Sequence, residues 1–286
     1  MPITTLQLSQ AIENTLVARN PRHMKTAQAA LTPGYYLRAA RYLEGISGSV
    51  IIGTGFPVGD TFETDGPVGA IALYDTLKTL GADPWIACAP PLSAALQEDY
   101  QVLELQAPDL ECARKEAAHY LSKLSPCAII SIERPGLTGD GRYYNMRAED
   151  ITTRCGFFDP YLDAATCPSI AIGDGGNEIG MGNIAGALSG LDINVAVTGC
   201  DELLVTDVSN WGAYGLITFL GLWAGQDLLA VLSPPTILDY LSNKGSVDGV
   251  TRKNTATEDG LPVSEGISVI KELQRLTASL LDKSQE

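Results

Sequence analysis

The run SVIIGT at residues 49–54 and the run CAIISI at residues 127–132 decide the fold of this chain. Both runs are short, rich in β-branched residues and apolar almost throughout. Strands with this composition are buried on both faces, as in a parallel sheet that helices cover on each side. Further β-rich apolar runs lie at residues 84–88, 101–105, 169–172 and 194–198. We therefore predict a mostly parallel sheet with a strand at each run.

Helical patterns lie between these runs. Apolar residues recur at helical spacing after Pro67, and similar patterns occupy residues 109–124 and 210–224. Strands that alternate with helices indicate an α/β fold with a doubly wound sheet flanked by helices. We expect residues 1–45, which are mostly helical in pattern, to form a cover on the sheet. A last helix is expected after Ser264, its candidate N-cap.

Length and charge narrow the class of protein. The chain has 286 residues, with 19 Lys and Arg against 34 Asp and Glu, so its formal net charge is −15. This balance argues against binding to nucleic acid. No apolar run approaches the roughly 18 residues of a membrane span, and the first residues lack the layout of a signal peptide. We expect one cytoplasmic domain, residues 1–286, with reduced cysteines and no membrane partner.

The motifs of several cofactor and catalytic classes are missing. The Gly-rich stretch after the first predicted strand has Val58 where a dinucleotide fingerprint needs its third glycine, and Pro57 interrupts the helix start. No phosphate-binding P-loop motif is present, so no nucleotide cofactor is expected. The two histidines, His23 and His119, are not paired in spacing, which leaves zinc-hydrolase and Ser-His-Asp schemes without their residues.

Acidic and glycine-rich segments follow four of the predicted strands. They read ETDGP at residues 63–67, ERPG at 133–136, GDGGNEIG at 173–180 and GCDE at 199–202. Loops at the carboxyl ends of parallel strands lie along one edge of the sheet, where such folds bind ligands, so these carboxylates are expected to converge. Taken singly, each segment is also consistent with a helix N-cap and a tight turn.

Carboxylates that share one cleft cannot all be ionised without a counter-charge. Either a hard cation binds among them, or some of them are protonated and act as acids. The oxygens of Asp174, Glu178 and Asp201 are of the kind that Mg²⁺ and Mn²⁺ prefer, so a divalent metal is a candidate cofactor.

These loops resemble the D-glutamate cyclase family in order and wording. The resemblance covers nearly the whole chain, and the block GDGGNEIGMGN is far more specific than a short glycine motif. The residues that carry the match are TGFP at 54–57, ETDGPVGA at 63–70, ERPG at 133–136, DGRYYNMR at 140–147, GDGGNEIGMGN at 173–183 and DELLVTDVSNWGAYGL at 201–216.

The resemblance implies a hydro-lyase that converts D-glutamate, a small acidic amino acid, to 5-oxo-D-proline and water. The amino group attacks its own γ-carboxylate, which requires a base, a polarising charge and an acid for the departing oxygen. Two alternatives remain: a metal-dependent enzyme for another small amino-dicarboxylate or lactam, and a non-catalytic binding protein for an acidic amino acid.

Roles for individual residues follow from the loops and the resemblance together, without a decision on which carboxylate is base and which is acid. The expected catalytic residues are Glu63, Asp65, Glu133, Asp174 and Glu178. The expected metal ligands are Asp174, Glu178 and Asp201. Substrate binding is expected from Thr54, Arg134, Gly175, Gly176, Asn177 and Asp248. Arg142 and Arg147 are further candidates to attract a substrate carboxylate or, alternatively, surface ion pairs.

The segment at residues 245–260 is polar and rich in glycine. Its composition offers little apolar surface to hold it down, while Asp248, Thr251, Arg252 and Asp259 could contact a small charged ligand. We expect a loop that is more mobile than the sheet and closes over the site as a lid; the alternative is an ordinary surface loop.

Overall fold

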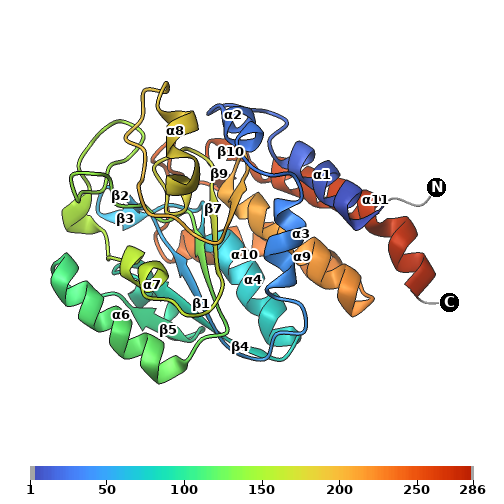
Figure 1. Cartoon of the computed structure of the whole chain (residues 1–286), viewed down its shortest axis with the longest axis horizontal. Helices are drawn as coiled ribbons and strands as arrows, with labels where there is room; N and C mark the ends of the chain where they lie inside the picture. Colours follow the sequence, from blue (N-terminus) through green and yellow to red (C-terminus); the bar gives the residue numbers. More distant parts are fainter. Residues whose placement is uncertain (1–3, 285–286) are drawn as a thin grey trace.

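The central sheet has six strands in the order β5-β4-β1-β6-β7-β8, and every neighbouring pair is parallel. The structure, a computed structural model, describes residues 4–284, with side chains up to residue 281. Its ribbon is shown in Figure 1. The predicted doubly wound α/β fold with a parallel sheet is confirmed. The strands are β1 (Gly48–Thr54), β4 (Ala82–Cys88), β5 (Val102–Glu104), β6 (Ala128–Ile132), β7 (Ser169–Gly173) and β8 (Glu202–Val205).

The strand order reverses between β1 and β6. From β1 the chain builds outward through β4 to β5, then returns to the other side of β1 and builds outward through β6 and β7 to β8. Connections on the two sides of this reversal leave a crevice at the carboxyl ends of the strands, which is where open α/β sheets bind ligands. The topology therefore places a site beside the ends of β1 and β6.

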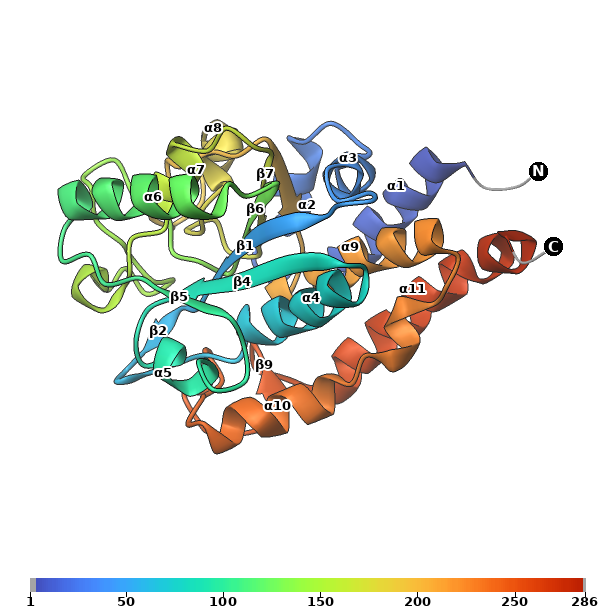
Figure 2. The same ribbon diagram turned by 90° about the horizontal axis from the view of Figure 1, so that it is seen from below.

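Helices cover both faces of the sheet. Figure 2 shows α4, α10 and α11 on one side of it and α6 and α7 on the other. Helix α9 is buried on almost every side because it packs between the sheet and α11. Among the described helices, none is long and apolar enough to cross a membrane. The helices of the two layers are α4 (Pro67–Thr79), α5 (Leu92–Leu96), α6 (Leu110–Leu124), α7 (Asp159–Asp163), α8 (Ala185–Leu188), α9 (Ser209–Ala224), α10 (Pro234–Asn243) and α11 (Val263–Ser284).

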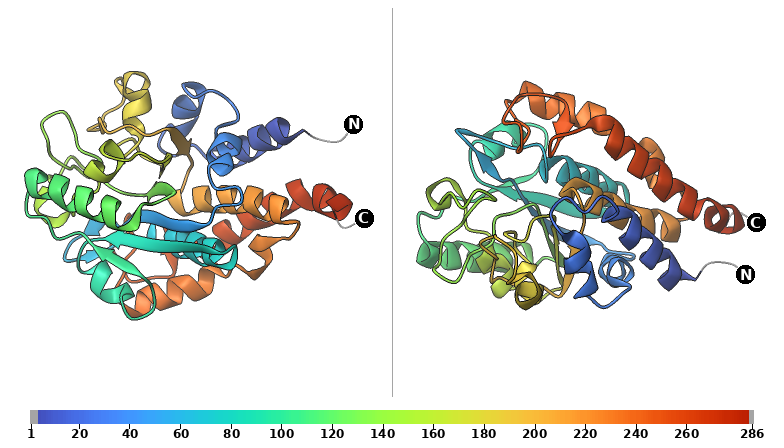
Figure 3. Two further views of the ribbon diagram at one scale, coloured as in Figure 1. Left: turned by 60° about the horizontal axis from the view of Figure 1, so that its bottom comes forward. Right: turned by 90° about the horizontal axis from the view of Figure 1, so that it is seen from above.

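The amino-terminal residues form the expected helical cover as α1 (Thr5–Leu16), α2 (Met24–Ala29) and α3 (Tyr35–Arg41). Helix α1 begins with a capping box between Thr4 and Gln7. It lies along α11, as both views of Figure 3 show, while α3 packs against β8 and α9. The cover thus closes the β8 edge of the sheet.

Short elements complete the chain. The hairpins β2 (Pro57–Val58) with β3 (Thr61–Phe62) and β9 (Thr257–Glu258) with β10 (Leu261–Pro262) are antiparallel and lie outside the main sheet. The 3₁₀ turns are η1 (Thr152–Arg154), η2 (Met181–Ile184) and η3 (Leu228–Val231).

The deciding run SVIIGT forms the centre of the core. Val50, Ile51 and Ile52 are fully buried between the two helix layers. A side chain at Gly53 would lie 2.1 Å from the ring of Phe158, so only glycine lets that ring pack on the strand. The near-continuous apolar pattern predicted this double-sided burial.

The prediction of a strand at residues 194–198 is wrong. That segment has no regular structure, and its amides donate instead to loop carbonyls: Ala196 to Gly176, and Val197 to Leu137. The sixth strand is β8, a few residues later in the chain. Its run is shorter and begins with Glu202, so the sequence interpretation assigned that acidic start to the loop after a strand.

Candidate active site

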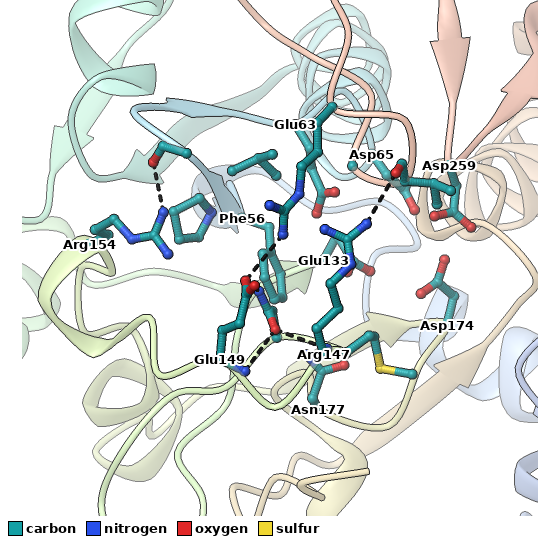
Figure 4. Close-up of a pocket in the computed structure, with 18 of the residues that line it drawn as sticks. Phe56, Glu63, Asp65, Glu133, Arg147, Glu149, Arg154, Asp174, Asn177 and Asp259 are labelled. Carbon is teal, nitrogen blue, oxygen red and sulfur yellow. Dashed lines mark hydrogen bonds and ion pairs between the residues drawn. The ribbon is translucent and has the colours of Figure 1, made fainter. Parts of the chain in front are cut away.

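A pocket of about 610 Å³ opens at the carboxyl ends of β1, β6 and β7. Its lining combines those strand ends with residues of the 145–154 and 249–259 segments and with Arg22. Four carboxylates form its base, and none of them is more than 8% exposed. We call them the acidic floor, and Figure 4 labels each of them. They are Glu63, Asp65, Glu133 and Asp174.

The carboxylates of the floor crowd together. Single oxygens of Asp65, Glu133 and Asp174 lie within 4.8 Å of one another. Glu133 and Asp174 directly follow β6 and β7, and Asp65 follows β1 after the β2–β3 hairpin. The carboxyl edge of the parallel sheet thus brings them to one point, as the sequence predicts. At this separation the charge on one carboxylate opposes ionisation of the next.

Asp65, which lies just before α4, caps the N-terminus of α9. Asn210, at the start of α9, caps the N-terminus of α4. The oxygens of Asp65 accept hydrogen bonds from the amides of Ser209 (3.0 Å) and Asn210 (2.8 Å) at the start of α9. The side-chain oxygen of Asn210 accepts from the amides of Gly66 (2.8 Å) and Gly69 (2.7 Å) at the start of α4. Two helix N-termini therefore meet at the floor, and their positive ends favour an anion there.

Glu133 is held in a strained backbone conformation. Its φ is +46°, in the left-handed region, and the Ser209 hydroxyl donates to its carboxylate over 2.5 Å. A side chain at Gly66, whose own φ is +90°, would lie 2.7 Å from the Cβ atom of Glu133. The close approach of these two loops therefore requires glycine at position 66.

Arg22 brings a positive charge to the floor. Its guanidinium forms ion pairs with Asp174 (2.7 Å) and with Asp259. Only 20% of the Arg22 side chain is exposed, so this charge acts in a largely desolvated setting. Arg22 therefore joins the turn between α1 and α2 to the end of β7 and to the β9–β10 hairpin.

The floor carboxyl groups differ in their affinity for protons. Burial raises the pKa of Glu133 well above the usual range, and the charges of Asp174 and other carboxylates raise it further. Burial and Asp259 also raise the pKa of Asp65, but the amides of Asn210 and Ser209 oppose them, and its pKa is about 6. These surroundings favour the ionised form of Asp65 and the protonated form of Glu133.

Exposed arginines surround the opening of the pocket. We call Arg147, Arg154, Arg252 and Glu149 the arginine mouth; all of them line the pocket and are solvent-exposed. Arg252 pairs with Glu149 over 3.1 Å. Arg147 donates to the carbonyl of Val250 over 3.3 Å, and Arg154 to the carbonyl of Gly59 over 2.8 Å. The pocket therefore has a negative base and a mainly positive rim.

Residues 12–274 match the family described as D-glutamate cyclase-like, C-terminal. The chain belongs to this family. The human mitochondrial D-glutamate cyclase is 35% identical to it over 195 residues, which is 59% of this chain and 32% of that protein. The match thus spans about a third of the length of the curated relative. The D-glutamate cyclase family resemblance found in the sequence is confirmed.

Two of the predicted metal ligands of this D-glutamate cyclase-like chain lie outside the pocket lining. Glu178 turns back onto its own loop, where its carboxylate accepts from the amide of Gly176 over 2.7 Å. Asp201 accepts from the amide (2.8 Å) and hydroxyl (2.9 Å) of Ser169, the first residue of β7. It therefore lies at the amino edge of the sheet, away from the floor. The misplaced sixth strand accounts for this error.

Of the predicted substrate-binding residues, Asn177 lines the pocket, and its side-chain oxygen is buried without a hydrogen-bond partner. Thr54, Gly175 and Gly176 are not part of the described lining. Arg134 does not face a substrate carboxylate, because its guanidinium donates to the backbone carbonyls of Thr54 (3.2 Å) and Gly55 (2.9 Å) and to that of Gly156. It stabilises the turn after β1 instead.

Asp248 is a structural residue of the 245–260 segment. It is fully buried and accepts from the amides of Val250 (3.0 Å), Thr251 (2.7 Å) and Gly260 (2.6 Å). The expectation that little holds this segment down is therefore wrong, since polar contacts replace the missing apolar ones. A side chain at Gly249 would lie 1.7 Å from the Glu63 carboxylate, so the segment lies directly against the floor. Its motion as a lid stays a prediction.

Several lining residues were missed by the sequence analysis, because they belong to segments without a strand-end pattern. Arg142 forms a surface ion pair with Asp150, as one of its alternatives predicts. Arg147 lines the mouth, and its attraction of a substrate carboxylate stays a prediction. The missed charged residues are Arg22, Glu149 and Arg154, whereas Asp259 was expected among the ligand contacts of the 245–260 segment.

Proposed function

We propose that the pocket catalyses the cyclisation of D-glutamate to 5-oxo-D-proline with release of water. Membership of the D-glutamate cyclase-like family supports this reaction class. The observation that carries the proposal is the floor, where oxygens of Asp65 and Glu133 lie within 4.8 Å of each other and the surroundings raise the pKa of Glu133 well above its usual range and that of Asp65 to about 6. Carboxyl groups whose surroundings push their pKa values apart supply a base and an acid at the same pH.

The chemistry balances within the substrate. The amino nitrogen forms a bond to the γ-carboxyl carbon, and one carbon–oxygen bond of that group breaks. The ammonium loses two protons, and both leave with the oxygen as water. Asp65 accepts the two protons from the nitrogen one after the other, and Glu133 donates two to the departing oxygen in the same way. A proton passes from Asp65 to Glu133 after each transfer, so both groups return to their starting states. Because both reacting groups belong to one molecule, folding the substrate chain supplies much of the rate.

Positive charge near the floor offsets the approach of the γ-carboxylate. Arg22 and the N-termini of α4 and α9 supply it. The 245–260 segment lies against Glu63 and limits the entry of water on that side. Excluding water strengthens each of these electrostatic interactions.

The direct test is turnover by the purified protein, followed as formation of 5-oxoproline from D-glutamate and from L-glutamate. Formation from D-glutamate that Glu133→Gln abolishes supports the proposal. Turnover of only another amino-dicarboxylate or of a lactam favours the alternative enzyme. Tight binding of D-glutamate without any product favours the binding protein.

As a second candidate, we propose that the floor binds a divalent cation, Mg²⁺ or Mn²⁺, through Asp65, Glu133 and Asp174. Binding would require Glu133 to lose its proton, so the cation would replace the acid–base pair rather than act beside it. The donors fit, since carboxylate oxygens are hard ligands and one buried oxygen of Asp174 has an ion pair with Arg22 but no hydrogen bond. When bound, the cation would supply charge that polarises the γ-carboxylate. Of the ligands expected from the sequence, only Asp174 remains in this set.

Calorimetric titration with Mn²⁺ tests the cation directly. Binding that Asp174→Asn removes and Glu178→Gln preserves supports the set of three ligands. Absence of binding at millimolar Mn²⁺ contradicts it and leaves Arg22 as the counter-charge. The cytoplasmic location is likewise a proposal; the human relative's name describes a mitochondrial protein.

A further inference from the structure

Two loops hold each other across the mouth of the pocket. Arg147 of the first loop donates to the carbonyl of Val250 in the second, and Arg252 of the second pairs with Glu149 of the first. Each contact joins residues 103 positions apart. Figure 4 shows the side chains of Arg147 and Glu149 reaching into the opening from the same loop. The contacts are reciprocal and lie where a ligand must pass.

The charges of the pocket are separated by depth. The buried floor is acidic, and the exposed arginines lie at the mouth. An amino acid enters such a pocket in one favoured orientation, with its ammonium toward the floor and a carboxylate toward the rim. For glutamate the γ-carboxylate must stay near the amino nitrogen for ring closure. The α-carboxylate is therefore the group left for the arginines.

The ion pair between Arg252 and Glu149 can be broken by a competing carboxylate at little cost in free energy. Both side chains are nearly half exposed, at 45% and 49%, and ion pairs of this kind are weak. Asn145 donates to the same carboxylate oxygen of Glu149 over 2.6 Å, so Glu149 keeps a partner if Arg252 leaves. Within the described part of the chain, the Arg147 guanidinium donates to a single neutral carbonyl, that of Val250, and a guanidinium has five N–H donors to offer.

We propose that Arg147 and Arg252 bind the α-carboxylate of the substrate, and that Glu149 occupies Arg252 until that carboxylate displaces it. The inference rests on the proposed function, because it takes the substrate to be an α-amino dicarboxylate. It assigns Arg147 and Arg252 to substrate binding and makes Glu149 an internal competitor of the substrate.

Two glutamate analogues separate the α-carboxylate from the rest of the substrate. D-norvaline keeps the amine and the α-carboxylate, and 4-aminobutyrate keeps the amine and the γ-carboxylate. Calorimetric affinity for each, with KM for D-glutamate, is measured in the wild type and in the variants. Arg252→Ala weakens D-norvaline binding and raises KM by roughly tenfold or more, as expected for a lost charge-assisted hydrogen bond. Affinity for 4-aminobutyrate stays unchanged.

Substitution of Glu149 is the sharper test, because loss of its contact with Arg252 is expected to improve substrate binding. Glu149→Gln keeps an acceptor for Asn145 and lowers KM by about two- to fivefold, the size of an exposed ion pair. Glu149→Asp keeps the charge but cannot reach Arg252, so it also lowers KM. Asp150→Asn removes a charge from the adjacent residue, which pairs with Arg142 outside the pocket, and leaves KM unchanged.

The outcomes separate this inference from the proposed function. If D-glutamate is not turned over while D-norvaline binding responds to Arg252→Ala and Glu149→Gln, the proposed reaction fails and the carboxylate site stands. If D-glutamate is turned over but its KM responds to neither variant, the carboxylate assignment is overturned and the reaction stands. An equal response of 4-aminobutyrate also overturns the assignment.

Discussion

The acidic floor and the arginine mouth of the same pocket are built in different ways. The floor carboxylates follow strands β1, β6 and β7, are buried, and are fixed by helix N-termini and by Arg22. The mouth residues lie on long loops, are exposed, and bind backbone carbonyls or each other. The rigid part is suited to proton transfer, which needs fixed geometry, and the adaptable part to admitting and releasing the substrate.

This contrast predicts which changes affect rate and which affect affinity. Floor variants should lower kcat, because their contacts act on the reacting atoms. Mouth variants should change KM, because their contacts act on a part of the substrate that does not react.

The largest effect is expected for Glu133→Gln. The amide keeps the shape and the contact with Ser209 but has no acidic proton, so kcat should fall by about 10²–10⁴-fold. Initial rates of 5-oxoproline formation, with circular dichroism to confirm folding, measure this. Glu178→Gln is the matched control because Glu178 is also buried but outside the pocket lining. An equal loss in both variants would remove the distinction between the floor and its surroundings.

The pH dependence of turnover sharpens the assignment of the base. Burial and Asp259 raise the pKa of Asp65 to about 6, and a base must be ionised to accept a proton. We expect kcat to rise about tenfold per pH unit below pH 6 and to level off above it. Rates measured between pH 4.5 and 8 check this limb. A flat profile over that range would exclude Asp65 as the base.

Asp248→Ala distinguishes structure from ligand binding in the segment between floor and mouth. Removing this buried carboxylate leaves the amides of Val250, Thr251 and Gly260 without their acceptor. These bonds are only partly buried, and a hydrogen bond to a charged acceptor contributes about 1.5–3 kcal/mol, so the free energy of unfolding should fall by about 1.5–3 kcal/mol. Urea denaturation measures it, with Arg252→Ala as an exposed control that should unfold like the wild type.

The smallest effect concerns Glu258, which lies behind the floor and is bound by Asn210 over 2.9 Å. Burial, and then Asp65, raise the pKa of Glu258 from 4.5 to about 8. The folded protein therefore holds a proton that the unfolded chain releases, and stability due to this group falls as pH rises from about 4.5 to about 8. In the Glu258→Gln variant, the free energy of unfolding should decrease less over this pH range.

Thermal melting of wild type and Glu258→Gln at pH 5 and pH 8 tests this linkage. The melting temperature of the variant should rise relative to that of the wild type at pH 8, and this advantage should disappear at pH 5. Kinetic parameters should change little, since Glu258 is not part of the described pocket lining. A larger gain at pH 5 would show that Glu258 is ionised in the folded state.

The sequence predicted the floor well and the mouth poorly, for a physical reason. Continuous apolar strands require a parallel sheet, and a parallel sheet brings the segments after β1, β6 and β7 to one edge. Glu63, Asp65, Glu133 and Asp174 follow from that rule alone. Asp201 failed because its prediction depended on the exact end of a strand, and Asn194–Thr198 was apolar enough to imitate one.

Arg22, Glu149 and Arg154 had no comparable signal. Their positions depend on how long connections fold over the sheet, and no short-range pattern in the chain specifies this. Arg134 shows the converse: it stands in a loop beside a floor residue, yet its guanidinium donates to the backbone behind that loop. Proximity in sequence to a catalytic loop does not decide the direction in which a long side chain points.

The hydrogen bonds by which Asp65 caps the N-terminus of α9 have a consequence for how the chain acquires activity. These two hydrogen bonds join residues 144 and 145 positions apart. Closing so long a loop comes late in folding, because its entropy cost must be met before the contacts form. If the proposed function holds, the nascent chain therefore stays inactive during synthesis until α9 has emerged and docked. For the same reason, turnover should vanish at the first detachment of α9, while most of the helical circular dichroism signal persists.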